Sequence, residues 1–162
     1  MTANACSTPS VELNAEEDDP PHAAAHRSPS TLMRLELGGE VASVPLARRR
    51  VGAFLASRVC PDVWDDTLLL VGELLANSVL HTASGREPYG KVTLTVLHRD
   101  GVVRVDVIDD GSTTSAPRVR DAGTEREGGR GLLLVDRIAD RWGTCVHGAR
   151  RVVWCELGER KP

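Results

Sequence analysis

Three polar side chains recur at intervals of four residues: Glu73, Asn77 and His81. On an α-helix this spacing places them on one stripe. An amide oxygen is a hard ligand of the kind that Mg²⁺ accepts while it keeps several waters. A carboxylate can accept a proton from an attacking hydroxyl. A solvated helix face is the ordinary alternative, but Asn77 is a poor residue for a helix interior. The stripe is therefore a candidate for magnesium and phosphate chemistry, with the solvated face as the alternative.

A second candidate site follows the apolar segment 102–108, where the sequence continues Asp109-Asp110-Gly111. A carboxylate at the end of a strand can accept a hydrogen bond from an exocyclic amine such as that of adenine. A glycine two residues later allows a flat ring to approach the backbone. An ordinary Asp-Gly turn is the alternative interpretation.

A third candidate is the glycine-rich segment before a predicted helix, which contains Gly129, Arg130, Gly131 and Leu132. Exposed backbone N–H groups and the helix dipole attract an anion at such a position. Arg130 can contact a phosphate oxygen. A flexible loop that is merely rich in glycine remains the alternative.

Two further patterns are rejected. The segment 85–91 has the spacing of a phosphate-binding P-loop, but Val92 replaces the required Ser or Thr and the segment runs from helix to strand. Cys145, His147 and Cys155 lack the C-x-x-C spacing and the fourth ligand of a zinc site.

The elements that must position these residues follow from hydrophobic periodicity and turn residues. We expect strands at 32–37, 91–99, 102–108, 142–147 and 151–157, and helices at 43–59, 62–82 and 131–140. Ser43 is the candidate N-cap of the first helix. Asp100-Gly101 predicts a tight hairpin turn. Because hairpins dominate, we expect a mixed or antiparallel sheet. Three helices on one face would complete a two-layer α+β sandwich.

Composition sets limits on the class of protein. The 162 residues carry a net charge of −3, and residues 1–30 hold five acids and one base. We expect a flexible acidic tail at 1–30 and one domain at 31–158. The near-neutral domain argues against a nucleic-acid binder. The sequence shows neither a membrane span nor a secretory signal, and its cysteines indicate thiols of a cytoplasmic protein.

Taken in order, the three candidate sites resemble the GHKL superfamily of ATP-binding domains. Residues 73–81 resemble its N box, residues 109–111 its first glycine box and residues 129–132 its second. The small size and the ending from Val135 to Leu157 are similar to the anti-sigma-factor serine/threonine kinases. The resemblance covers residues 31–158.

The resemblance implies a role for each residue of the first two boxes. Asn77 would bind Mg²⁺ that bridges the ATP phosphates, and Glu73 would be the catalytic general base. The resemblance implies that His81, like Asn77, would bind the nucleotide. Asp109 would hold the adenine amine, and Gly111 would admit the ring.

For the remaining positions the resemblance implies phosphate binding and a lid. Gly129, Arg130, Gly131 and Leu132 would lie at the phosphates, and residues 112–128 would form a short lid over the nucleotide. The implied partners are an anti-anti-sigma protein, which accepts the phosphate, and a sigma factor. A homodimer is usual in this branch.

The sequence departs from the pattern at Thr113, which replaces a glycine, and at Val152, which replaces a Thr near the adenine. These changes leave two alternatives to a kinase. One is a nucleotide-binding switch that controls partner affinity without transferring phosphate. The other is a partner-binding module that no longer binds nucleotide.

Overall fold

The computed structural model describes residues 30–111 and 130–158. They form nine elements in the following order along the chain: β1 (Thr31–Gly38), α1 (Ser43–Leu55), α2 (Pro61–His81), α3 (Ala83–Arg86), β2 (Lys91–Arg99), β3 (Val102–Asp109), α4 (Arg130–Ile138), β4 (Arg141–His147) and β5 (Arg150–Gly158). The expected tail at 1–30, apart from Ser30, lies outside the described residues. Among those residues, no helix is both long and apolar enough to cross a membrane.

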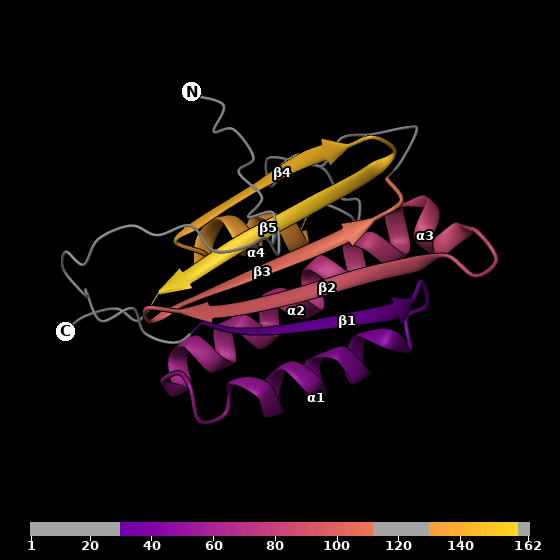
Figure 1. The fold of residues 1–162 in the computed structure, drawn as a ribbon. Helices are drawn as coiled ribbons and strands as arrows, with labels where there is room; N and C mark the ends of the chain where they lie inside the picture. The colour runs from indigo at the N-terminus through magenta and orange to yellow at the C-terminus, as the bar shows by residue number, and fades with distance from the viewer. Residues whose placement is uncertain (1–29, 112–129, 159–162) are drawn as a thin grey trace, which may run out of the picture.

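The five strands form a single antiparallel sheet in the order β1-β2-β3-β5-β4. The helices cover one face of this sheet, with α1 beneath β1 and α4 near β5 (Figure 1). The α+β two-layer sandwich predicted from the sequence is therefore confirmed, and the sheet is antiparallel rather than mixed. The β2–β3 turn has positive φ at Asp100 and Gly101, as a tight hairpin requires.

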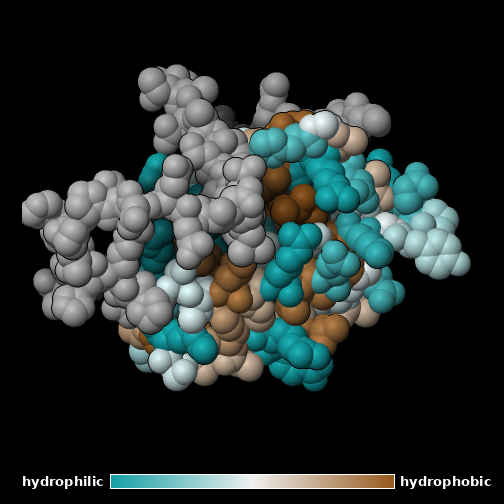
Figure 2. Space-filling model, viewed as in Figure 1, coloured by the Kyte–Doolittle hydropathy of each residue, from teal (hydrophilic) through white to brown (hydrophobic). Residues whose placement is uncertain are grey.

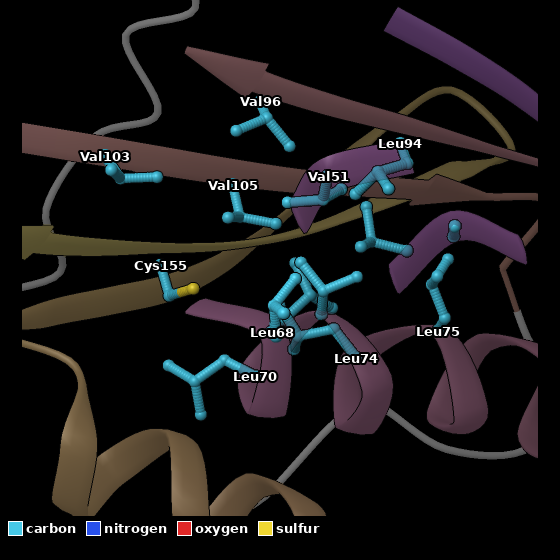
Figure 3. Packing of buried hydrophobic residues seen from close by; sticks show 14 of the residues in the cluster. Val51, Leu68, Leu70, Leu74, Leu75, Leu94, Val96, Val103, Val105 and Cys155 are labelled. Carbon is cyan, nitrogen blue, oxygen red and sulfur yellow. The ribbon is translucent and has the colours of Figure 1, made fainter. Parts of the chain in front are cut away.

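The core lies between the sheet and α2. Alternate residues of β3 are fully buried because successive strand side chains point to opposite faces. Val103 and Val105 from β3, with Cys155 from β5, point toward Leu70 and Leu74 of α2 (Figure 3). This packing fixes α2 against the centre of the sheet, and so it fixes which residues of α2 face the strand ends.

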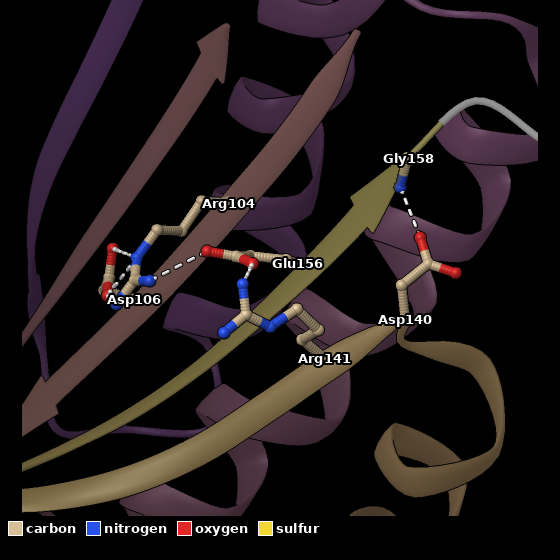
Figure 4. A network of polar contacts seen from close by, with 6 residues as sticks. All are labelled: Arg104, Asp106, Asp140, Arg141, Glu156 and Gly158. Atoms are coloured by element: carbon tan, nitrogen blue, oxygen red, sulfur yellow. Dashed lines mark hydrogen bonds and ion pairs between the residues drawn. The ribbon is translucent and has the colours of Figure 1, made fainter. Parts of the chain in front are cut away.

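The other face of the sheet carries a charged network. Arg104 donates hydrogen bonds to Asp106 and to Glu156, at 2.9 Å each, and its guanidinium stacks on the Trp154 ring at 4.4 Å from the centroid. Arg141 pairs with Glu156 at 3.6 Å (Figure 4). Figure 2 shows this side of the molecule as a mixture of hydrophilic and hydrophobic patches.

The first helix differs from the prediction at both ends. It ends at Leu55 rather than Val59, and its last carbonyls find side-chain donors: Trp64 Nε1 donates to the Gly52 oxygen at 2.9 Å. The predicted N-cap was wrong. Ser43 is already helical and buried, because a turn at 40–44 leads into the helix and Ala42 occupies the cap position without a side-chain bond.

A fourth helix, α3, was not predicted. The sequence suggested that α2 continues to residue 82, but α2 ends at His81 and Thr82 adopts an extended conformation. Thr82 Oγ1 donates to the Ser78 carbonyl at 2.5 Å, which satisfies one of the free carbonyls at the helix end. The chain then turns once more as α3. This extra turn brings α3 to the same end of the sheet as the end of β3 (Figure 1).

Candidate functional site

The predicted polar stripe lies on the second half of α2. Glu73 and Asn77 are half-buried, and His81 is exposed at the last residue of the helix. Asn77 Nδ2 is buried and has no hydrogen-bond partner among the described residues. An orphaned buried amide is rare in folded proteins, and it often marks a place where a ligand supplies the partner. The amide nitrogen of Asn77 is therefore not exposed on a solvated helix face.

The first turn of α4 packs against this stripe. A Cβ added to Gly131 would lie 2.8 Å from Glu73 Oε2 and 3.1 Å from Asn77 Nδ2. The glycine thus lets the start of α4 lie directly against the ends of these two side chains. The structure thus brings together Glu73, Asn77 and Gly131, although Gly131 lies more than fifty residues further along the chain. The first-turn N–H groups of α4 have no acceptor within the helix, and the helix dipole favours an anion there.

The end of β3 places Asp109 in a buried polar cluster. Its carboxylate oxygen Oδ2 accepts a hydrogen bond from Ser78 Oγ at 2.8 Å and pairs with Arg151 Nη2 at 2.7 Å. The other oxygen, Oδ1, accepts from the Gly111 N–H at 2.9 Å. A buried carboxylate needs such partners, because removing it from water is costly unless it is paired.

Gly111 follows with a positive φ of 71°, and a Cβ there would lie 2.8 Å from the Ala149 carbonyl oxygen. Its own carbonyl accepts a hydrogen bond from Ala83 of α3 at 2.8 Å. A second hydrogen bond also joins α3 to the end of β3: the Asp110 N–H donates to Ser84 Oγ at 2.9 Å. Two hydrogen bonds with α3 therefore hold the backbone at the end of β3 in place.

Helix α2 links the two clusters through consecutive residues. Asn77 faces Gly131 at the start of α4, and Ser78 bonds to Asp109 at the end of β3. One end of the sheet therefore carries the Glu73 carboxylate and the Asn77 amide beside the N-terminus of α4. The buried Asp109 carboxylate lies nearby, because it bonds to Ser78, the residue that follows Asn77 on the helix. This arrangement can hold phosphates and a cation at one side and a polar ring at the other.

The structure describes only part of the second glycine box. Gly129, Thr113 and the predicted lid at 112–128 lie outside the described residues. Arg130 is the first residue of α4. The Leu132 side chain is 6% exposed and belongs to the hydrophobic core, so a phosphate contact by this residue would come from its backbone.

Sequence analysis missed two residues of the site, Ser78 and Arg151. Each had a weak signal: Ser78 is a polar residue in an otherwise apolar helix segment, and Arg151 is a charge in an apolar strand. The sequence-based prediction named Val152 as the residue of this strand near the adenine. The register pairs Val152 with Ile108 and pairs Arg151 with Asp109, so Arg151 is the residue of β5 that faces the candidate base site.

The residues present fit an ATP–magnesium site. The amide oxygen of Asn77 can serve as a ligand of Mg²⁺, its NH₂ group can donate to a phosphate oxygen, and Glu73 adds a carboxylate nearby. No set of three or more His, Cys, Asp or Glu side chains within residues 30–111 and 130–158 is arranged to hold a metal ion. Cys155 is buried in the core, where desolvation raises its pKa to about 12 and keeps it a thiol.

The fold and this site define an α+β domain of the nucleotide-binding type. Residues 38–154 match the histidine kinase-like ATPase domain, and the chain belongs to this family.

Two individual proteins are also similar. An uncharacterised protein of Streptomyces coelicolor is 38% identical over 90 residues, which are 56% of this chain and 83% of that protein. The crystal structure of the RsbU and RsbW domains of Rv1364c from Mycobacterium tuberculosis has a TM-score of 0.62 at 15% identity. The match covers 82% of this chain and 33% of that one, and it shows a shared fold.

Proposed function

We propose that this protein is an ATP- and Mg²⁺-dependent serine/threonine kinase that regulates transcription. Its substrate would be an anti-anti-sigma protein and its second partner a sigma factor. The observation that carries the proposal is the convergence of Glu73, Asn77 and Gly131 at the start of α4. Family membership supports ATP as the nucleotide. The protein would act in the cytoplasm as a homodimer, without direct contact to nucleic acid or membrane.

In this proposal the nucleotide spans both clusters. Asp109 accepts the adenine amine, and the ring lies beside the backbone at Gly111. The phosphates lie at the N-terminal end of α4, near Gly131, where backbone N–H groups and the helix dipole favour negative charge. Asn77 would be the protein ligand of Mg²⁺. When bound, the ion would neutralise charge that builds up on the phosphates.

Glu73 would be the general base. Its carboxylate accepts the proton of the attacking Ser or Thr hydroxyl, whose oxygen forms a bond to the γ-phosphorus. The bond between that phosphorus and the bridging oxygen breaks, and ADP leaves. The proton on Glu73 then passes to water. The place of Glu73 beside Gly131, and so beside the expected phosphates, supports this role. Loss of such a base lowers a rate by about 10²–10⁴-fold.

The proposed partners rest on the resemblance of the three boxes to anti-sigma-factor kinases. They gain support from the fold shared with the RsbU and RsbW domains. A carboxylate base suits a serine or threonine acceptor, because the hydroxyl must lose a proton as it attacks.

The test is phosphate transfer from ATP labelled on its γ-phosphate to anti-anti-sigma proteins from the same genome. The wild type should label a Ser or Thr of one of them. Glu73→Gln should lower the rate by about 10²–10⁴-fold. Asp65→Asn, at an exposed acid on the same helix, is the matched control and should stay within about twofold.

Two outcomes would count against the kinase. Labelling by Glu73→Gln at the wild-type rate would contradict the base. ATP binding with no transfer to any of these proteins would instead indicate a nucleotide-driven switch of partner affinity.

A further inference from the structure

The buried pair of Asp109 and Arg151 stands where a nucleobase is expected. The two residues are direct neighbours across β3 and β5, so their side chains lie on the same face of the sheet. That face is the one that carries the core. The Arg151 side chain is 8% exposed and the Asp109 side chain is fully buried. An arginine is an unusual residue to bury at this depth unless each of its donors has a use.

Arg151 has a buried donor that lacks an acceptor among the described residues. Nη2 bonds to Asp109, but the buried Nε–H has no acceptor among the described residues. Leaving a charged donor unpaired in the interior is costly, and most such donors are paired in folded proteins. The planar guanidinium holds Nε and Nη2 in a fixed relation. An acceptor for Nε would therefore lie close to Asp109, within the same small region.

Asp109 can offer little more by itself. A carboxylate accepts about four hydrogen bonds. Asp109 already accepts three, from Ser78, Arg151 and Gly111. One position remains, which suffices for a single bond to an amine. Any second contact to a base must come from another group, and Arg151 is the adjacent one with a free donor.

We propose that Arg151 is a nucleobase-binding residue that determines specificity. It donates from Nε to the adenine ring nitrogen beside the amine, N1 or N7, while Asp109 accepts the amine. Adenine presents this donor–acceptor combination on both edges that carry the amine. The inference rests on the proposed function, because it requires ATP with its base at Asp109.

The experiment is calorimetric titration of the full-length protein with three nucleotides, ATP, 1-deaza-ATP and 7-deaza-ATP, each with Mg²⁺. Each analogue replaces one ring nitrogen by a CH group. The wild type should bind one of the analogues at least about tenfold more weakly than ATP, because a bond to a charged donor is lost. The analogue that is affected identifies N1 or N7.

Variants assign that penalty to Arg151. In Arg151→Met the penalty should vanish, so that ATP and the analogue bind within about twofold of each other. Arg150→Met, at the exposed neighbour, is the matched control and should keep the penalty. Arg151→Lys keeps a positive charge beside Asp109 but lacks the planar side-on donors. If melting curves show that Arg151→Met is unfolded, Arg151→Lys takes its place in the test. In Arg151→Lys the affinity difference between ATP and the analogue should also be smaller than in the wild type.

Two results would overturn the inference alone: equal wild-type affinity for all three nucleotides, or a penalty that persists without Arg151. Absence of ATP binding by the wild type would overturn the proposed function together with it.

Discussion

Ser78 Oγ donates a 2.8 Å hydrogen bond to Asp109 Oδ2, and this contact joins residues 31 positions apart in the chain. It ties the last turn of α2 to the end of β3. Because Asn77 precedes Ser78 on the same helix, the bond also sets how far the candidate phosphate site lies from the candidate base site. The site is therefore built around two consecutive residues of one helix.

Removing this bond should cost stability. Ser78→Ala leaves the buried Asp109 carboxylate with one donor fewer, and hydrogen bonds to charged groups contribute about 1.5–3 kcal/mol. We expect the free energy of unfolding, measured by urea titration, to fall by that amount. Ser57→Ala, at an exposed position, should change it by less than about 0.5 kcal/mol. Equal effects of the two variants would contradict the role given to Ser78.

Gly131→Ala should separate stability from nucleotide binding. The new methyl group would displace the ends of two flexible side chains, Glu73 and Asn77, and no backbone atom stands among its nearest contacts. Alanine in place of a helical glycine also favours the helix by up to about 1 kcal/mol. We expect unchanged or slightly raised stability in urea titration, with ATP affinity clearly reduced in calorimetry.

The control for this variant is Gly72→Ala on α2, where the nearest contact would be Arg48 at an ordinary 3.4 Å. It should leave ATP affinity unchanged. Wild-type affinity in Gly131→Ala would mean that the start of α4 does not form part of the site.

Gly111→Ala should destabilise the fold through two effects. A positive φ costs an L-residue about 1–2 kcal/mol. The added Cβ would also lie 2.8 Å from the Ala149 oxygen. Gly148→Ala has the first effect without the second, because its φ is +61° and its Cβ would face open space. We expect Gly111→Ala to lose about 1–3 kcal/mol more than Gly148→Ala in unfolding titrations. Equal losses would show that the close approach is absent.

The buried thiol of Cys155 predicts a stability change at high pH. Desolvation raises its pKa from 9.0 to about 12 in the folded protein. Between these values the unfolded chain loses this proton and the folded chain keeps it. Its contribution is therefore full below pH 9 and is lost as the pH rises toward 12, by at most about 1.4 kcal/mol per pH unit.

The measurement for this prediction is urea titration of the wild type and Cys155→Ala from pH 8 to 11. Other groups titrate in both proteins, so the informative quantity is the difference in slope. The wild type should lose stability more steeply above pH 9. Parallel curves would show that the thiol is not held in its neutral form.

Much of this arrangement was predictable from local patterns. Strand alternation and the Asp100-Gly101 turn gave the hairpin of β2 and β3, and the sheet class followed from the number of hairpins. The spacing of Glu73 and Asn77 indicated a shared helix face, and the structure places both beside Gly131. These features depend on periodicity and on residues close in sequence, which a single chain displays directly.

The features that were missed depend on long-range register. Whether Arg151 or Val152 faces Asp109 is decided by strand pairing, because a shift of one residue moves a side chain to the other face. Ser78 gains its role only from a partner on β3. The short helix α3 and the early end of α1 depend on donors from neighbouring segments, such as Trp64. No local pattern encodes such contacts.

The most direct test of the central claim is calorimetric titration of the full chain with ATP, with and without Mg²⁺, in the wild type and in Asn77→Ala. We predict binding that is strengthened by Mg²⁺ in the wild type, with the magnesium effect lost in Asn77→Ala. Asn77 Nδ2 has no partner within the described residues, so the variant should remain folded. Identical magnesium dependence in both proteins, or no ATP binding by the wild type, would contradict the account.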